Sequence, residues 1–333
     1  MSFGIDILED EIQSWGHEIL ETLLLDRTTG ENIIWATDDY QSRGDGYGFH
    51  DFITSDKICG NNKHVIQPRI SKSFEEQKRR IVDKAEVFTP SWICNAQNNL
   101  IDKTWFQTEQ DVFNHEDEVN NTWEPTQQLP PYPKGKSWRS YVMENRLEMA
   151  CGEAPYLCSR YDTTTGVMIP ISRRIGLLDR KLQLVGANTP DVSPDMNKAE
   201  RKNTHKIWHR AAYKALQSTY GFEWQGDNLL LARESLLITF IEYYQAKWNT
   251  DRLPDRECLR KAAEIISWNI WQMDGLKYGI PGYVPSERLE NELFAPSVPV
   301  RERFCRIREW TSQEPLKGED VIFAKVLKPN NEK

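Results

Sequence analysis

The sequence predicts an α/β fold built on a parallel sheet. Three short apolar stretches, at 146–149, 222–224 and 269–273, each lead into a turn. Helical patterns lie between the first stretch and the second, and again between the second and the third. Parallel strands need such crossover connections, so this order favours a parallel sheet with helices on both faces.

The first hundred residues predict helices around a turn-rich stretch. Apolar residues at helical spacing predict an amphipathic helix over 5–27. Residues 28–72 are rich in turn formers, with strand candidates at 32–36 and 64–70. A charged helix is expected over 74–83, and Ser91 is expected to cap a helix that runs to residue 100.

The rest of the chain alternates loops with longer helices. Residues 106–137 are acidic and then proline-rich, which predicts a surface loop. Helices are predicted over 206–219, 228–248 and 255–267, and weak strands near 304–307 and 321–326. These patterns divide the chain into an N-terminal α/β region (1–83), a central domain (84–284) and a C-terminal extension (285–333).

Composition excludes several classes of protein. Six cysteines form no C-x-x-C pair, so neither a structural zinc site nor a disulfide scaffold is expected. No secretory signal and no long apolar run is present, which predicts a cytoplasmic protein without membrane association. The net charge of −8 gives no basic footprint for DNA, although local basic clusters exist. The 12 Trp, 12 Tyr and 12 Phe residues are suited to a core and also to stacking on purines.

Two strand ends carry a carboxylate followed by a turn and a helix. Glu148 is followed by small residues up to Gly152, which would let the backbone approach a ligand closely. Glu223 ends the next strand, where a carboxylate can accept hydrogen bonds from ribose hydroxyls. Trp224 beside it could cover an adenine ring. The alternative is structural in both places: a strand-to-helix turn at 148–157, and a corner with a buried tryptophan at 220–228.

Two further segments extend this pattern. Asp274 follows the third strand candidate, where a carboxylate could accept from an exocyclic amine, although Asp-Gly is also an ordinary turn. Earlier in the chain, the Thr89 hydroxyl and free backbone N–H groups beside a bend fixed by Pro90 could hold a carboxylate. Each of these two signals is weak when it is taken alone.

The order of the four segments resembles the permuted arrangement of adenine-N6 DNA methyltransferases. Here the segments are F-T-P, EMACGEAPYL, YGFEWQGDNLLLARESLL and NIWQMDGL. The family has F-T-P, then D/E-P-A-C-G-x-G-x-F-L, then Y-G-x-(D/E), then N-I-x-x-G-D-x-L. The resemblance covers roughly 84–280 and is greatest to bacterial proteins labelled restriction endonuclease subunit M.

The resemblance implies a Rossmann-like fold that binds S-adenosylmethionine and acts on double-stranded DNA. The partners implied are DNA, reached directly or through a partner subunit, and the other subunits of a restriction–modification system. The cofactor site implied consists of a methionine end, a turn beneath the cofactor, a ribose ligand, an adenine cover and a reader of the adenine amine. Phe88, Thr89 and Pro90 would border the methionine end, and Glu148, Ala150, Cys151 and Gly152 would form the turn. Glu223 would bind the ribose, Trp224 would cover the adenine, and Asp274 would read its amine.

This chain departs from the family in two respects. The family's (N/D)-P-P-(Y/F) motif, which holds the flipped target base, is absent: the one Pro-Pro pair, Pro130-Pro131, follows Leu129. Ala154 stands where the family's turn has its second glycine, which requires a negative φ there. The catalytic residues are therefore unknown, and the alternative is a non-catalytic cofactor- or DNA-binding subunit. His205 and His209 have metal-ligand spacing but no third ligand, so no metal is expected.

Overall fold

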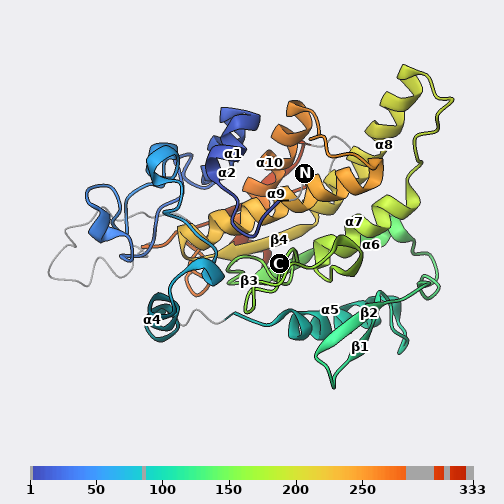
Figure 1. Cartoon of the computed structure of the whole chain (residues 1–333), viewed down its shortest axis with the longest axis horizontal. Coiled ribbons are helices and arrows are strands. Elements are labelled where there is room, and N and C mark those ends of the chain that lie inside the picture. The colour runs from blue at the N-terminus through green and yellow to red at the C-terminus, as the bar shows by residue number, and fades with distance from the viewer. Residues whose placement is uncertain (1–2, 85–87, 283–303, 311–315, 328–333) are drawn as a thin grey trace, which may run out of the picture.

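The computed structural model describes residues 3–84, 88–282, 304–310 and 316–327 (Figure 1). The chain is a mixed α/β protein with a small parallel sheet of three strands in the order β3-β4-β5. The strands are β3 (Arg146–Met149), β4 (Thr219–Glu223) and β5 (Ile270–Gln272). Met149 pairs with Phe222 and Glu223 with Gln272, so all three strands end on the same side. The parallel pairing is confirmed, but β4 begins three residues before the stretch predicted at 222–224, and the helix expected to reach residue 219 ends at Gln217.

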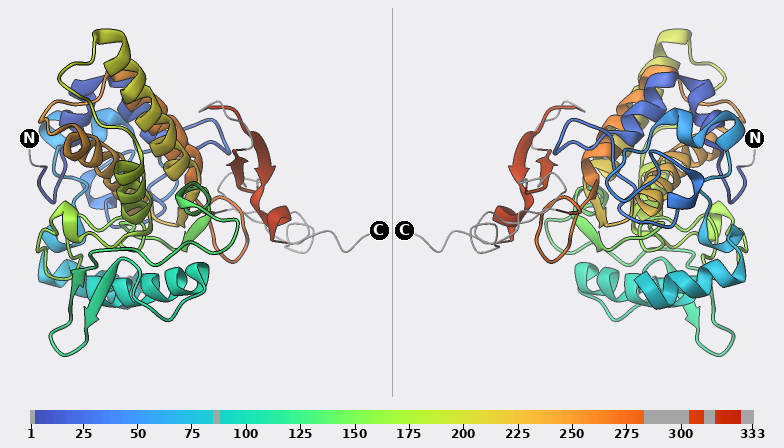
Figure 2. Two further views of the ribbon diagram at one scale, coloured as in Figure 1. Left: turned by 90° about the vertical axis from the view of Figure 1, so that its right-hand side faces the viewer. Right: turned by 90° about the vertical axis from the view of Figure 1, so that its left-hand side faces the viewer.

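Helices fill the two crossovers and cover one face of the sheet (Figure 2). The chain passes from β3 to β4 through α7 (Leu177–Asn188) and α8 (Lys198–Gln217), and from β4 to β5 through α9 (Gly226–Trp248) and α10 (Arg256–Asn269). α9 is buried on almost every side because α2, α7 and α10 pack around it. This explains its run of leucines, since a helix enclosed by its neighbours needs no polar face.

The opposite face of the sheet is not covered by a layer of long helices, although helices were predicted on both faces. A hairpin of β6 (Arg306–Glu309) and β7 (Glu319–Ile322) leads into the short helix α12 (Phe323–Val326). Phe323 and Ile307 pack on Phe222 and Trp271, which belong to β4 and β5. Apolar side chains from the hairpin and from α12 take the place of a second helical layer there.

The N-terminal region corrects three predictions. The helix expected over 5–27 is two helices, α1 (Glu9–Trp15) and α2 (His17–Leu24), separated at Gly16. The candidates at 32–36 and 64–70 form isolated bridges or turns instead of strands. One reason lies in the contacts of Ile34, whose backbone N–H and C=O bond the side-chain amide of Gln272 and not a strand.

The segment before the sheet contains more regular structure than predicted. The charged helix is confirmed as α4 (Phe74–Lys84), and α5 (Ser91–Phe106) begins after Pro90, which takes the capping position expected of Ser91. The expected loop holds a hairpin of β1 (Asn114–Asp117) and β2 (Thr122–Pro125), followed by α6 (Trp138–Val142). The remaining short helices of the described residues are α3 (Ser55–Ile58) and the 3-10 turns Gln41–Arg43, Gly60–Asn62, Arg69–Ser71 and Ile171–Arg173. Among the described residues, no helix combines the length and apolarity needed to cross a membrane.

Candidate functional site

A cavity of about 510 Å³ opens at the carboxyl ends of β3 and β4. Its walls come from three separate parts of the sequence: the residues before α5, the turn after β3, and the residues that join β4 to α9. Eight of the predicted site residues are among its lining, namely Phe88, Thr89, Glu148, Ala150, Cys151, Gly152, Glu223 and Trp224. The sheet thus brings together segments that lie far apart in the sequence.

The turn after β3 is held in an unusual backbone conformation. Ala150, Gly152 and Ala154 have φ of 50°, 53° and 62°, which places all three in the left-handed region. The negative φ that would make alanine compatible with the family's glycine position is therefore not present at Ala154. The turn is held by backbone hydrogen bonds from Cys151 N–H to the Phe222 carbonyl (2.9 Å) and from Ala154 N–H to the Cys151 carbonyl (2.7 Å). Non-glycine residues in this region carry strain that the surrounding structure must offset.

Glu148 lies beneath the turn and binds backbone groups. Its carboxylate accepts hydrogen bonds from the N–H groups of Tyr156 (3.3 Å) and Leu157 (3.2 Å). Burial raises the pKa of Glu148 well above its usual value, and the two N–H groups oppose that shift. The acidic residue at the end of β3 therefore fixes the shape of the turn.

Glu223 joins the two sides of the cavity. Its carboxylate accepts one hydrogen bond from the Gly152 N–H (2.9 Å), in the turn after β3. It accepts a second from the Gln225 N–H (3.2 Å), just after β4. Burial raises its pKa, while these backbone hydrogen bonds favour the charged form. Each carboxylate oxygen can accept more than one hydrogen bond, so both retain capacity for a ligand hydroxyl.

Two aromatic rings line the same cavity. Trp224 is held by a hydrogen bond from Nε1 to the Ala36 carbonyl (3.0 Å) and lies edge-on to Phe49. Phe88 carries the Arg69 guanidinium over its ring at 4.9 Å. Residues of the N-terminal region thus hold both rings in place. No sequence pattern predicted these contacts.

Cys151 and Pro90 have structural positions. Burial raises the pKa of the Cys151 thiol well above its usual value, which keeps it a thiol and not a nucleophile. Its sulfur lies against Gly221 of β4, where an added Cβ would be 3.2 Å from Sγ. Pro90 follows the lining residue Thr89 and caps the start of α5, but it does not itself line the cavity.

Comparisons of the chain with protein families, with curated proteins and with solved structures gave no match.

Asp274 is not brought to the cavity. Its carboxylate closes its own turn by accepting from Leu276 N–H (2.9 Å) and Lys277 N–H (3.2 Å). At the end of β5 the place beside Glu223 is taken by Gln272, whose side chain binds the backbone of Ile34. Only two of the three expected carboxylates therefore line one cavity, because the N-terminal region covers the end of the third strand.

Sequence reasoning missed several lining residues. Tyr156, Gln225 and Asn228 lie in the cavity wall within a few residues of the motifs. Each residue lies a few positions after the end of β3 or β4. Extending the motifs by one turn beyond each strand would therefore have found them. Met149 and Pro155 also line the cavity.

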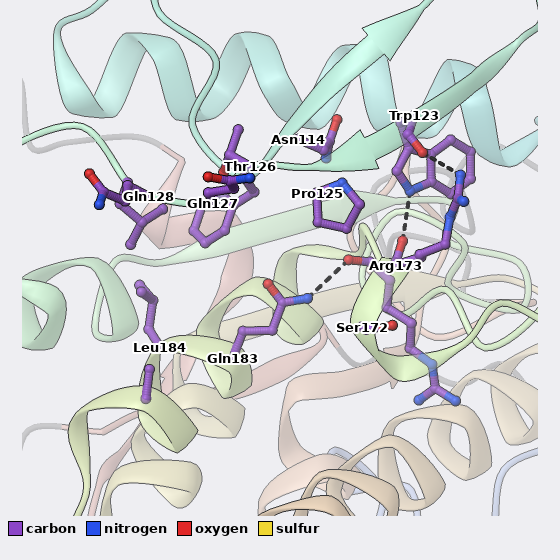
Figure 3. A pocket seen from close by; sticks show the side chains of 14 residues that line it. Asn114, Trp123, Pro125, Thr126, Gln127, Gln128, Ser172, Arg173, Gln183 and Leu184 are labelled. Carbon is purple, nitrogen blue, oxygen red and sulfur yellow. Dashed lines mark hydrogen bonds between the residues drawn. The ribbon is translucent and has the colours of Figure 1, made fainter.

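A second cavity, of about 290 Å³, lies between the β1–β2 hairpin and α7 (Figure 3). Side-chain amides of Asn114, Gln127, Gln128 and Gln183 surround it, and Gln183 donates to the Arg174 carbonyl. No carboxylate lines it, and it is remote from the strand ends, where α/β sheets bind ligands. It is the weaker candidate.

The two histidines that share a helical face serve packing. His205 stacks on Trp248 with ring centroids 4.2 Å apart, and His209 lies parallel to Tyr213 and Tyr244. Burial lowers the pKa of His209 to about 4. Within the described ranges, no group of three or more His, Cys, Asp or Glu side chains could hold a metal ion.

Proposed function

We propose that this chain binds S-adenosylmethionine in the cavity at the ends of β3 and β4. We further propose that its fold is a Rossmann-like methyltransferase fold, and that it serves as an adenine-N6 DNA methyltransferase or as the modification subunit of a restriction–modification system. The observation that carries the proposal is the convergence of Phe88-Thr89, 148–156 and 223–228 around one cavity. These are three of the four segments that resemble the family, brought together at the ends of parallel strands.

The cavity has the size and the chemical groups for a nucleoside cofactor. Its volume of about 510 Å³ falls within the range of roughly 300–1,000 Å³ typical of small-molecule sites. We assign Glu223 to the ribose hydroxyls, because its carboxylate lies at the end of the second strand and is ordered by two backbone N–H groups. Trp224 would lie against the adenine, and Phe88 with Thr89 would border the methionine end.

The assignment of Glu223 is tested by cofactor titration. Calorimetric titration of the purified chain with S-adenosylmethionine should show saturable binding. Glu223→Gln removes the charge that strengthens hydrogen bonds to the ribose, which are worth about 1.5–3 kcal/mol. We therefore expect roughly tenfold or greater loss of affinity.

Glu124→Gln is the matched control, since Glu124 lies on β2, pairs with Arg173 and does not line the cavity. Its affinity for the cofactor should equal that of the wild type. Failure of the wild-type chain to bind S-adenosylmethionine, or equal binding of ATP, would refute the cofactor assignment. Unchanged affinity in Glu223→Gln would refute the ribose assignment alone.

A second candidate is a non-catalytic subunit that binds the cofactor or DNA and relies on a partner for the target-base motif. Two observations favour it: the absence of (N/D)-P-P-(Y/F) and the net charge of −8. Transfer of labelled methyl groups from S-adenosylmethionine to double-stranded DNA by the chain alone separates the two candidates. Transfer supports the enzyme; cofactor binding without transfer supports the subunit.

A further inference from the structure

Helix α8 carries a strong positive charge in a protein whose net charge is −8. Its sequence contains six Lys or Arg residues and a single carboxylate, Glu200. Four of the cations are exposed and recur at every fourth residue, so they form one continuous row along the helix. We call this row the α8 ridge; its members are Lys198, Lys202, Lys206 and Arg210.

The first part of α8 projects from the rest of the protein (Figure 1, Figure 2). Every residue from 198 to 203 is exposed, and the first buried side chain of the helix is Thr204. This end is held by its cap rather than by packing, because the Asn197 side chain accepts from the N–H groups of Ala199 (2.9 Å) and Glu200 (3.0 Å). The ridge is therefore accessible to a large partner.

The charges of the ridge are unfavourable for α8 on its own. Like charges four residues apart on a helix repel each other. Lys198 and Lys202 also lie near the amino end of the helix, where the helix dipole disfavours cations. Within the described ranges, no member of the ridge forms an ion pair. A local conflict of this kind is expected where the side chains serve a function, and here a bound anion would relieve it.

The acidic side chains nearest to the ridge in the sequence are engaged with other groups. Asp191 pairs with Lys247, and Asp195 accepts from the Ser193 hydroxyl (3.1 Å). Glu200 completes the capping box at the start of α8. The charge of the ridge is therefore left for a partner to neutralise.

The ridge ends at a cavity of about 970 Å³ between α6, the end of α7 and α8. Arg210 and Lys214 line this cavity from α8, and Arg139 lines it from α6, where its guanidinium lies 4.5 Å from the ring centre of Trp138. No carboxylate is among the described residues that line it. The positive surface thus continues from α8 onto α6.

We propose that the α8 ridge, extended by Arg139, binds the phosphodiester backbone of double-stranded DNA. A regular row of cations suits a polymer that carries a negative charge on every repeat. Single-stranded nucleic acid is a poorer match, because proteins that bind it present aromatic rings to its bases. The exposed residues of α8 include no aromatic side chain. Phosphate contacts carry no sequence information, so the ridge holds DNA without selecting a site.

This inference rests on the proposed function for the choice of DNA over another polyanion. It assigns a DNA-contact surface that the cofactor assignment does not use, since no residue of α8 lines the cavity at the ends of β3 and β4. Binding of DNA and binding of S-adenosylmethionine can therefore be measured, and lost, separately.

Fluorescence anisotropy of a labelled DNA duplex of mixed sequence measures binding by the full chain over a series of salt concentrations. The logarithm of the association constant should fall linearly with the logarithm of the salt concentration, by about 0.9 for each phosphate that is neutralised. For the ridge together with Arg139 we expect a slope of about −4.

The double variant Lys202→Gln/Lys206→Gln removes two neighbouring charges from the middle of the ridge. We expect it to bind the duplex roughly tenfold more weakly and to have a salt slope shallower by about 2. Its thermal midpoint should not fall, because the two charges repel each other in the free chain. The matched control is Lys63→Gln/Lys325→Gln, which makes the same change in net charge at exposed positions outside α8. Its salt slope should equal that of the wild type.

Absence of saturable duplex binding, or equal losses in the two double variants, would overturn the proposal. Displacement of the duplex by polyglutamate at an equal concentration of charge would do the same, because it would indicate an acidic protein as the occupant. Titration of the same variants with S-adenosylmethionine separates the two proposals. A chain that binds the duplex through α8 but no S-adenosylmethionine retains this inference and loses the cofactor assignment; the opposite result does the reverse.

Discussion

At the scale of single residues, the turn after β3 concentrates unfavourable backbone conformations beside the cavity. Ala150 and Ala154 are alanines in the left-handed region, and Gly152 between them shares it. Strain of this kind is retained where the surrounding structure fixes the backbone, and here Glu223 and Glu148 provide the fixing hydrogen bonds. The turn therefore has its shape before any ligand binds.

Ala150→Gly should stabilise the protein. Ala150 is exposed and has a φ of 50°, so glycine relieves the Cβ strain without opening a cavity in the core. We expect the free energy of unfolding to rise by about 0.5–1 kcal/mol in urea denaturation. Ala96→Gly in α5 is the control and should lower it by about 1 kcal/mol. A loss of stability in Ala150→Gly would contradict the strain at this turn.

At the scale of elements, α1 and α9 each bury an acidic side chain, and the two side chains repel each other electrostatically. Glu9 and Glu234 are both buried, and Glu234 has neither oxygen hydrogen-bonded within the described residues. Burial raises the pKa of Glu9 to about 9, and the neighbouring Asp6 and Asp10 add to the shift. Glu9 is therefore protonated at neutral pH in the folded chain but ionised in the unfolded chain.

This difference sets the sign of a pH effect. Between its usual pKa and about 9, the folded state binds one more proton than the unfolded state, so stability falls as pH rises across that window. Glu9→Gln should remove the part of this dependence that Glu9 contributes and stabilise the protein at pH 8 by about 1 kcal/mol or more, with little change near pH 4. Denaturation at both pH values measures the effect. Equal stabilities of the wild type and Glu9→Gln at pH 8 would show that Glu9 is ionised in the folded protein.

At the scale of the whole molecule, the N-terminal region is joined to the start of α9 by a buried ionic cluster. Asp227, at the start of α9, accepts from Tyr40 (2.7 Å) and pairs with Lys72 (3.3 Å) and Arg80 (2.9 Å). Burial disfavours the charged carboxylate, but the two cations hold the pKa of Asp227 well below its usual range. The cluster lies directly behind Gln225, which lines the cavity.

Asp227→Asn should therefore destabilise the protein strongly. Removing the carboxylate charge leaves Lys72 and Arg80 buried with less compensation, which typically costs about 3–5 kcal/mol. Thermal unfolding should show a clear drop in midpoint. Asp191→Asn is the control, because Asp191 pairs with Lys247 but its side chain is 84% exposed; it should change stability by less than about 1 kcal/mol. Similar effects in both variants would exclude the cluster as a structural link.

The sequence by itself determined the elements whose signals are local. Strand ends at Glu148 and Glu223, the helices between them and the parallel order could be predicted, because hydrophobic periodicity and turn residues are properties of short segments. The meeting of Glu148 and Glu223 at one cavity followed from the same order, since parallel strands end on one side, whereas Phe88 was expected there only from the family resemblance.

Only the tertiary structure decided which groups are engaged by distant parts of the chain. It placed Gln272 rather than Asp274 beside Glu223, broke the N-terminal helix at Gly16, and gave Ala154 a positive φ. Within the described ranges it also placed no strand beside the outer edge of β3. Each outcome depends on contacts between residues far apart in sequence, and no local pattern encodes the free energy of those contacts.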